Sequence, residues 1–195
     1  MMIVGLTGGI GSGKTTVAHL FQTMGCVIYN SDDKAKEVYF QSEVKRQVIE
    51  LLGIEAYLNE NEINKEYISK KVFSNTELLH QLNHIIHPAV KSDFILFKSK
   101  LPLGTIIIKE SAILFETGIY KDLEKTILVT APLEVKIDRV KKRNSTSEED
   151  IKKRMSAQWT DEQKAPLANF VIVNDGIKAL IPQVVTIIQQ LKSNA

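Results

Sequence analysis

Short runs of apolar residues alternate along this chain with longer segments in which apolar residues recur every three or four positions. The short runs, most of them rich in β-branched residues, predict strands at 2–6, 26–29, 105–109, 126–130 and 170–173. The longer segments predict helices over 15–24, 132–143 and 147–158, another that begins near residue 160, and a last one whose apolar face runs from Ile177 to Leu191. Pro182 is an awkward member of that last helix.

Strands that alternate with helices predict an α/β fold, in which a mostly parallel sheet is flanked by helices and ligands gather beyond the carboxyl ends of the strands. Between residues 33 and 100 the pattern changes to helices without obvious strands, and Pro88 is interpreted as reopening a helix after His87. We therefore expect one domain over residues 1–195, with a helical insertion at about 33–100.

Composition and charge narrow the class of protein. The chain has 195 residues, of which 44% are apolar and 25% charged, as in an ordinary globular domain. A formal net charge of +2 favours no nucleic-acid partner, and no apolar run approaches the roughly 20 residues that span a bilayer. The single cysteine, Cys26, cannot form an internal disulfide, which favours the reducing cytoplasm. The oligomeric state is left open.

The segment from Gly8 to Thr15 has the spacing of a phosphate-binding loop: a glycine, four residues, and then Gly-Lys-Thr. Its backbone N–H groups and the N-terminus of the following helix can hold phosphate oxygens, while the Thr15 hydroxyl can bind Mg²⁺. The alternative, a plain glycine turn, is disfavoured because an apolar strand precedes the loop and an amphipathic helix follows it. The residues expected to bind the nucleotide here are Gly9, Gly11, Ser12, Gly13, Lys14, Thr15 and Thr16.

Several segments, in order along the chain, resemble the dephospho-CoA kinase family. They are residues 5–14, 32–38, 86–88, 112–116 and 171–176, together with the side chains Arg139, Arg143, Arg154 and Gln158. The chain departs from the family pattern at two positions. Asn30 stands where the family usually has the first of two aspartates, and Ala112 stands where it usually has proline.

The resemblance implies a P-loop kinase that uses ATP and Mg²⁺ to phosphorylate the ribose 3′-hydroxyl of dephospho-CoA, which gives coenzyme A. It implies catalytic roles for Lys14, Asp32 and Arg139. It further implies that Arg139 and Arg143, beside a lid at about 140–150, and Asn174, after the last strand, contact the nucleotide.

Other interpretations of these residues remain open. Asp32 is either the general base for the acceptor hydroxyl or a helix N-cap, and Glu110 either holds the water shell of Mg²⁺ or is a solvated carboxylate at a strand end. Glu116 either serves the acceptor side or caps neighbouring backbone, and the two arginines can be surface residues. At the level of function, the alternatives are a nucleoside monophosphate or other small-metabolite kinase, and a regulatory NTPase switch.

Overall fold

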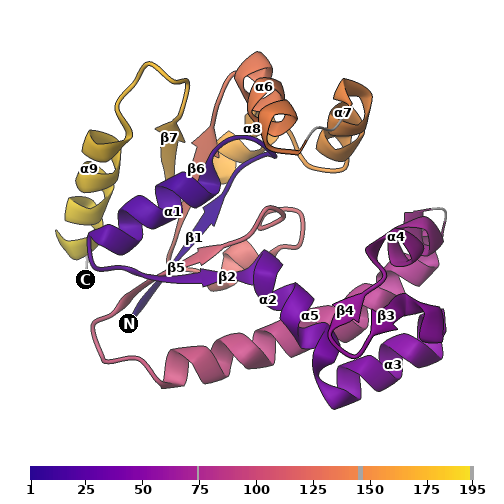
Figure 1. Cartoon of the computed structure of the whole chain (residues 1–195). Helices are drawn as coiled ribbons and strands as arrows, with labels where there is room; N and C mark the ends of the chain where they lie inside the picture. The colour runs from indigo at the N-terminus through magenta and orange to yellow at the C-terminus, as the bar shows by residue number, and fades with distance from the viewer. Residues whose placement is uncertain (74, 145–146, 194–195) are drawn as a thin grey trace. The chain divides into compact units, whose positions relative to one another are not determined.

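A computed structural model of the protein describes residues 1–73, 75–144 and 147–193, and its backbone divides into two compact units (Figure 1). Unit 1 comprises Met1–Asn30 and Pro102–Ala195, and unit 2 comprises Ser31–Leu101. Each unit has a hydrophobic core of its own. Within the described part of the chain, no helix is long and apolar enough to cross a membrane.

A five-stranded parallel sheet forms the centre of unit 1. Its strands are β1 (Met2–Thr7), β2 (Val27–Asn30), β5 (Ile106–Glu110), β6 (Lys125–Thr130) and β7 (Phe170–Val173). They lie in the order β2-β5-β1-β6-β7, and every neighbouring pair is parallel. Strand β1 therefore lies between β5 and β6, which both come later in the sequence, so the chain extends the sheet on both sides of β1. At such a switch point, ligands bind at the carboxyl edge of a parallel sheet.

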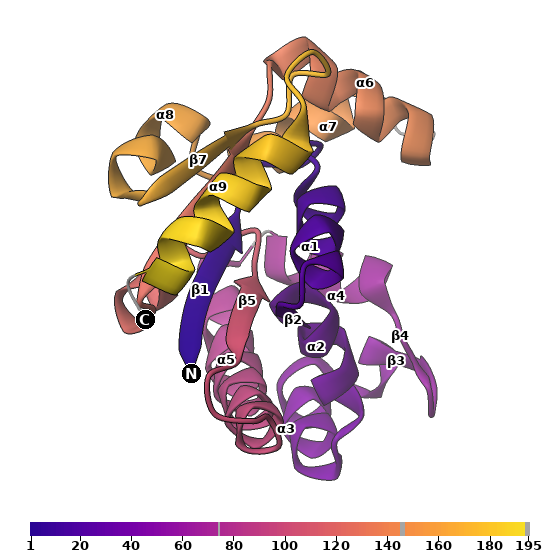
Figure 2. The ribbon, with the colours of Figure 1, turned by 90° about the vertical axis from the view of Figure 1, so that its left-hand side faces the viewer.

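Helices flank this sheet, as the alternating pattern predicts. The helices of unit 1 are α1 (Lys14–Thr23), α6 (Leu133–Asn144), α7 (Glu148–Ser156), α8 (Asp161–Lys164) and α9 (Leu180–Ser193), with short 3₁₀ turns η3 (Ile119–Asp122) and η4 (Ala165–Leu167). Of these helices, α1, α8 and α9 contact the strands. Figure 2 shows α1 and α9 side by side over the strands. Val17 and Phe21 of α1 and Val184 and Ile188 of α9 are buried together with strand residues in one core, which fixes the start of α1 over the end of β1.

Unit 2 contains a small hairpin that the sequence pattern does not reveal. Its elements are α2 (Ser31–Glu37), η1 (Val38–Phe40), α3 (Ser42–Leu52), η2 (Ile54–Ala56), β3 (Tyr57–Asn59), β4 (Glu62–Ile63), α4 (Lys65–Phe73) and α5 (Thr76–Ser99). The expectation of helices alone was wrong, because β3 and β4 pair antiparallel. Two such short strands carry too few residues to show a period of two.

Pro88 does not start a new helix, because α5 runs through it without interruption. A proline removes one backbone hydrogen bond, whereas Leu82, Ile86 and Phe94 are buried on both sides of it and stabilise the continuous helix. Asn75 is the N-cap of α5, and its side chain accepts a hydrogen bond from the Leu78 N–H at 3.0 Å. Ser74 lies outside the described residues.

Three predicted helices of unit 1 have different bounds in the structure. Helix α7 ends at Ser156, so that Gln158 lies beyond it, and α8 is a single turn that η4 follows from Ala165. Helix α9 begins at Leu180, which leaves Ile177 before the helix and 90% exposed. Pro182 therefore falls in the first turn of α9, where its missing N–H removes no helical hydrogen bond.

Candidate active site

The phosphate-binding loop joins β1 to α1 at the carboxyl edge of the sheet. Gly13 is the N-cap of α1 with φ of 90°, and Lys14 is the first residue of the helix. The first turn of α1 contains no acidic side chain, so nothing there offsets the positive N-terminal end of the helix. Thr15 and Thr16 are exposed in this turn. The loop and the helix start together form a site for an anion, as the sequence predicts.

Glycine is required in this loop because the backbone approaches its neighbours closely. Gly11 has φ of 80°, and a Cβ atom there would lie 2.4 Å from the backbone oxygen of Lys136. A Cβ atom at Gly13 would lie 2.2 Å from Nδ2 of Asn174. A side chain at either position would therefore have to displace α6 or the end of β7.

The Lys14 side chain is folded back over the loop. Its Nζ atom donates a hydrogen bond to the backbone oxygen of Gly8 at 2.9 Å. This contact places the ammonium group across the loop, where it adds a positive charge to that of the backbone N–H groups.

Two polar side chains from the carboxyl edge hold the far side of the loop. The guanidinium of Arg139, on α6, donates to the backbone oxygen of Gly11 at 3.5 Å and to the backbone oxygen of Asn174 at 3.0 Å. Asn174, only 8% exposed just after β7, donates from Nδ2 to the backbone oxygen of Ser12 at 2.8 Å. The structure thus brings together Arg139, Asn174 and the loop, which are far apart in the sequence.

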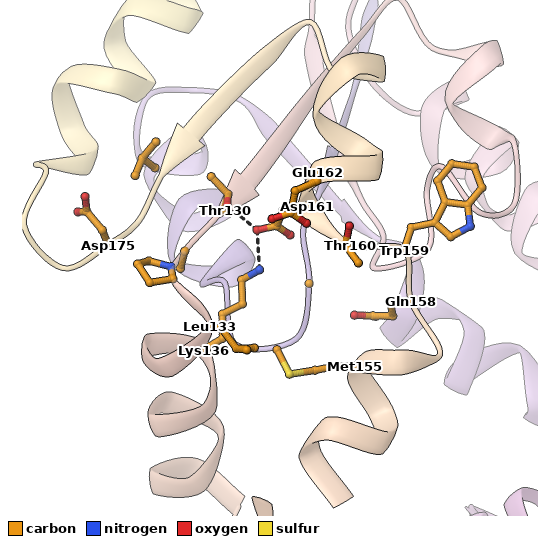
Figure 3. Close-up of a pocket in the computed structure, with 14 residues that line it drawn as sticks. Thr130, Leu133, Lys136, Met155, Gln158, Trp159, Thr160, Asp161, Glu162 and Asp175 are labelled. Carbon is orange, nitrogen blue, oxygen red and sulfur yellow. Dashed lines mark hydrogen bonds and ion pairs between the residues drawn. The ribbon is translucent and has the colours of Figure 1, made fainter. Parts of the chain in front are cut away.

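A second group of side chains supports the loop from the segments after β6. Gln158 accepts a hydrogen bond on Oε1 from the backbone N–H of Ile10 at 3.1 Å. Lys136, on α6, donates to Oδ2 of Asp161 at 2.5 Å, and the Thr130 hydroxyl donates to the same oxygen (Figure 3). This ion pair is almost buried, with 10% and 14% of the two side chains exposed, and it links α6 to α8 next to the loop.

A cavity of about 560 Å³ opens between these elements. Figure 3 shows Lys136 and Asp161 meeting at its centre, with Gln158 and Trp159 along one side. Its wall is formed by Gly9, Thr130, Ala131, Pro132, Leu133, Lys136, Met155, Gln158, Trp159, Thr160, Asp161, Glu162, Val173 and Asp175. The cavity therefore begins at the phosphate-binding loop, and Trp159 lies at its wall with 42% of its surface exposed.

Glu110 ends β5 at the same edge of the sheet. It pairs in register with Leu6 of β1 and with Asn30 of β2, and only 4% of it is exposed, so it is not a solvated strand-end residue. Among the described residues, no group of three or more His, Cys, Asp or Glu side chains is placed to hold a metal ion. One carboxylate and the Thr15 hydroxyl still suit Mg²⁺, which takes few protein ligands and completes its shell with phosphate oxygens and water.

Asp32 belongs to unit 2, two residues after the end of β2. The helix α2 begins at Ser31, so Asp32 lies within its first turn and is half-buried. The alternative interpretation of Asp32 as the N-cap was therefore wrong, because Asp32 is the second residue of the helix. A carboxylate in a first turn is still favoured by the helix dipole.

The predicted contact Arg143 and the predicted lid lie farther along α6 and at the start of α7. Arg143 lies one turn beyond Arg139 on α6, and its side chain is exposed. The predicted lid at about 140–150 comprises the last turn of α6 and the start of α7, while residues 145 and 146 lie outside the described residues.

Sequence reasoning missed a buried ion pair behind the cavity. Lys164 is completely buried, and its Nζ atom lies 2.9 Å from Oε1 of Glu116. The same oxygen accepts a hydrogen bond from the Trp159 N–H at 2.9 Å, so Glu116 caps backbone that is distant in sequence. The position of Glu116 in residues 112–116 was a usable signal. Lys164 gave none, since a lysine is normally exposed.

Three comparisons place the chain among known proteins. A family model described as dephospho-CoA kinase matches residues 2–179. The dephospho-CoA kinase of Bacteroides fragilis is 39% identical over 186 residues, which cover 95% of this chain and 90% of that protein. A solved structure of a Thermus thermophilus protein has 30% sequence identity and a TM-score of 0.85, and the match covers 97% of this chain and 96% of that one.

A second solved structure supports the fold alone. The dephospho-CoA kinase of Campylobacter jejuni has 24% identity and a TM-score of 0.69, and the match covers 99% of this chain and 98% of that one. With the fold and the phosphate-binding loop in agreement, the chain belongs to the dephospho-CoA kinase family, whose reaction is the ATP-dependent final step of coenzyme A biosynthesis.

Proposed function

We propose that the loop of unit 1 binds the triphosphate of ATP and that Asp32 serves the acceptor in the transfer to the ribose 3′-hydroxyl of dephospho-CoA. The observation that carries the proposal is the loop itself. Its glycines are packed against α6 and Asn174, its helix start bears no acidic side chain, and Lys14 lies across it. A loop with this geometry holds phosphate groups without having to reorganise.

On the donor side, the backbone of Gly9 to Gly13 and the first turn of α1 surround the phosphates. Lys14 gives up its hydrogen bond to Gly8 and binds the β- and γ-phosphates, while Arg139, and more weakly Arg143, neutralise charge on the transferred group. Thr15 and Glu110 would hold Mg²⁺, directly or through its water, and when bound this ion offsets the charge of the β- and γ-phosphates.

On the acceptor side, Asp32 accepts the proton of the 3′-hydroxyl. As the hydroxyl oxygen forms its bond to the γ-phosphorus, the bond between this phosphorus and the β–γ bridging oxygen breaks and ADP leaves. The carboxylate suits this role because it is half-buried, in a first helical turn, two residues beyond the strand β2 that ends beside Glu110.

The remaining parts of the proposal concern partners and location. Family membership does not favour the nucleoside monophosphate kinase or the regulatory switch. We propose that the chain works without a nucleic-acid partner, in agreement with a net charge of only +2. We further propose that it works in the cytoplasm, where ATP is plentiful and the buried thiol of Cys26 stays reduced.

A coupled assay of ADP release tests this function. With ATP and Mg²⁺, we expect dephospho-CoA to stimulate ADP release by at least about a hundredfold over the rate without acceptor, since slow hydrolysis alone is the mark of a switch. AMP and shikimate serve as control acceptors of other small-molecule kinases. ADP release that is independent of the acceptor, or greater with a control acceptor, would contradict the proposal.

A further inference from the structure

A chain of polar contacts connects the buried Lys164 to the phosphate-binding loop. Lys164 donates to the backbone oxygen of Ala112 at 3.3 Å and pairs with Oε1 of Glu116 at 2.9 Å. That carboxylate oxygen accepts a hydrogen bond from the backbone N–H of Trp159 at 2.9 Å. The side chain of the preceding residue, Gln158, accepts the Ile10 N–H of the loop at 3.1 Å.

We propose that Gln158 is a positioning residue for phosphoryl transfer, and that the Lys164–Glu116 pair acts through it by fixing the peptide between Gln158 and Trp159. Gln158 holds the tip of the loop in the conformation that receives the phosphates. Glu116 holds the backbone from which Gln158 projects, and Lys164 pairs with Glu116 so that neither buried charge lacks a partner.

The contact at Ile10 matters because the loop works through the direction of its N–H groups. Ile10 stands between Gly9 and Gly11, and a loop so rich in glycine has many accessible conformations. A fixed acceptor for the Ile10 N–H removes some of these conformations. A shift of about 1 Å in the reacting groups is enough to lower a transfer rate by a hundredfold.

The ion pair has the features of a group kept for placement instead of stability. Replacing a buried ion pair by apolar residues of similar volume is often neutral or stabilising, so the pair by itself is weak support for the fold. Moreover, Oε2 of Glu116 is buried and has no hydrogen-bond partner among the described residues. A buried oxygen without a hydrogen-bond partner lowers the stability of the fold. The need for an acceptor of the Trp159 backbone N–H explains why a carboxylate is nevertheless present here.

The first test changes Gln158 and follows the loop directly. In Gln158→Met, which removes the acceptor, we expect the Ile10 amide to exchange its hydrogen at least about tenfold faster by NMR. In Gln158→Glu, which keeps an acceptor oxygen, Ile10 should stay protected. Exposed Gln189 on α9 gives the control, Gln189→Met. Ile10 exchange in Gln158→Met equal to that of the wild type would overturn the proposal.

The kinetic part of this test rests on the proposed transfer to dephospho-CoA, whereas the exchange measurement needs no substrate and can fail independently of that function. We expect the kcat of Gln158→Met to fall by about tenfold or more, with the KM for dephospho-CoA within about threefold of the wild type. Fast Ile10 exchange with unchanged kcat, or lowered kcat with Ile10 still protected, would each show that Gln158 does not act by positioning the loop.

The second test compares two double variants that differ only in the acceptor for Trp159. Lys164→Met with Glu116→Gln keeps an acceptor, and Lys164→Met with Glu116→Met removes it, while neither leaves a buried charge unpaired. We expect the first to keep Ile10 exchange and kcat within about threefold of the wild type, and the second to match Gln158→Met. Equal behaviour of the two variants in exchange and kcat would overturn the role of the pair.

Discussion

The guanidinium of Arg139 binds both oxygen atoms of Asn174, the backbone carbonyl at 3.0 Å and the side-chain Oδ1 at 3.1 Å. The two residues are 35 positions apart. Because Asn174 also donates to the backbone oxygen of Ser12, this pair joins α6 and the end of β7 to the phosphate-binding loop. A planar guanidinium can make both bonds at once, which a single ammonium nitrogen cannot do with the same geometry.

Replacing Arg139 by lysine tests the importance of that planar group. Arg139→Lys keeps the charge, yet we expect turnover to fall by about tenfold and the KM for ATP to rise, since the fork is lost. Steady-state kinetics with ATP varied measure both effects. The exposed Arg46→Lys on α3 is the control. Unchanged kinetics in Arg139→Lys would show that the guanidinium of Arg139 has no special role in binding the nucleotide.

Removal of the Lys14 side chain should abolish most of the activity and preserve the fold. Lys14→Ala removes the hydrogen bond to the backbone oxygen of Gly8, and Lys14 does not belong to the hydrophobic core of unit 1, so the melting temperature should change by only a few degrees. Turnover should drop by at least about a hundredfold, because the charge on the phosphates is lost. Lys192→Ala, an exposed change on α9, serves as the control. Near-wild-type turnover in Lys14→Ala would rule out the assigned phosphate site.

Gly11 offers a test of the close approach between the loop and α6. Gly11 and Gly104 have φ of 80° and 83°, but a Cβ atom at Gly104 meets nothing within 4 Å. Gly104→Ala should therefore cost only the backbone strain, about 1 kcal/mol. Gly11→Ala has the same strain and a contact of 2.4 Å with the Lys136 backbone oxygen, so it should destabilise the protein further and weaken ATP binding. Chemical denaturation and ATP titration measure the difference, and equal effects of the two variants would contradict it.

The change Asp32→Asn separates proton transfer from helix stability. Asn cannot accept the proton, so we expect turnover to fall by about a hundredfold. The lost charge in the first turn of α2 should lower stability by less than about 1 kcal/mol, and ATP binding should persist. A largely dissociative transfer would make the loss of rate smaller.

Asp33→Asn provides the matched control for this change, because Asp33 lies in the same turn but is exposed and paired with Lys36 at 2.6 Å. Turnover of Asp32→Asn within about threefold of the wild type, with dephospho-CoA saturating, would show that the proton leaves by another route.

Local rules were sufficient for most of the elements in unit 1. The strand at 170–173 and the helix starts near residues 147 and 160 are confirmed because the signals for them lie within a few residues. The same rules were wrong where tertiary packing outweighs a local preference. Buried apolar residues on both sides of Pro88 stabilise α5 as one continuous helix. Ile177 is exposed although it continues the apolar pattern of α9.

The sequence by itself determined the phosphate-binding loop, because its glycines, Lys14 and Thr15 are consecutive and need no distant partner to be recognised. Only the tertiary structure decided what holds that loop: Arg139 and Asn174 on one side and Gln158 on the other, with Lys164 completely buried behind Glu116. The physical reason is that parallel strands bring the ends of β1, β6 and β7 to one edge of the sheet. Contacts made there join residues up to 162 positions apart, and no local pattern in the chain encodes them.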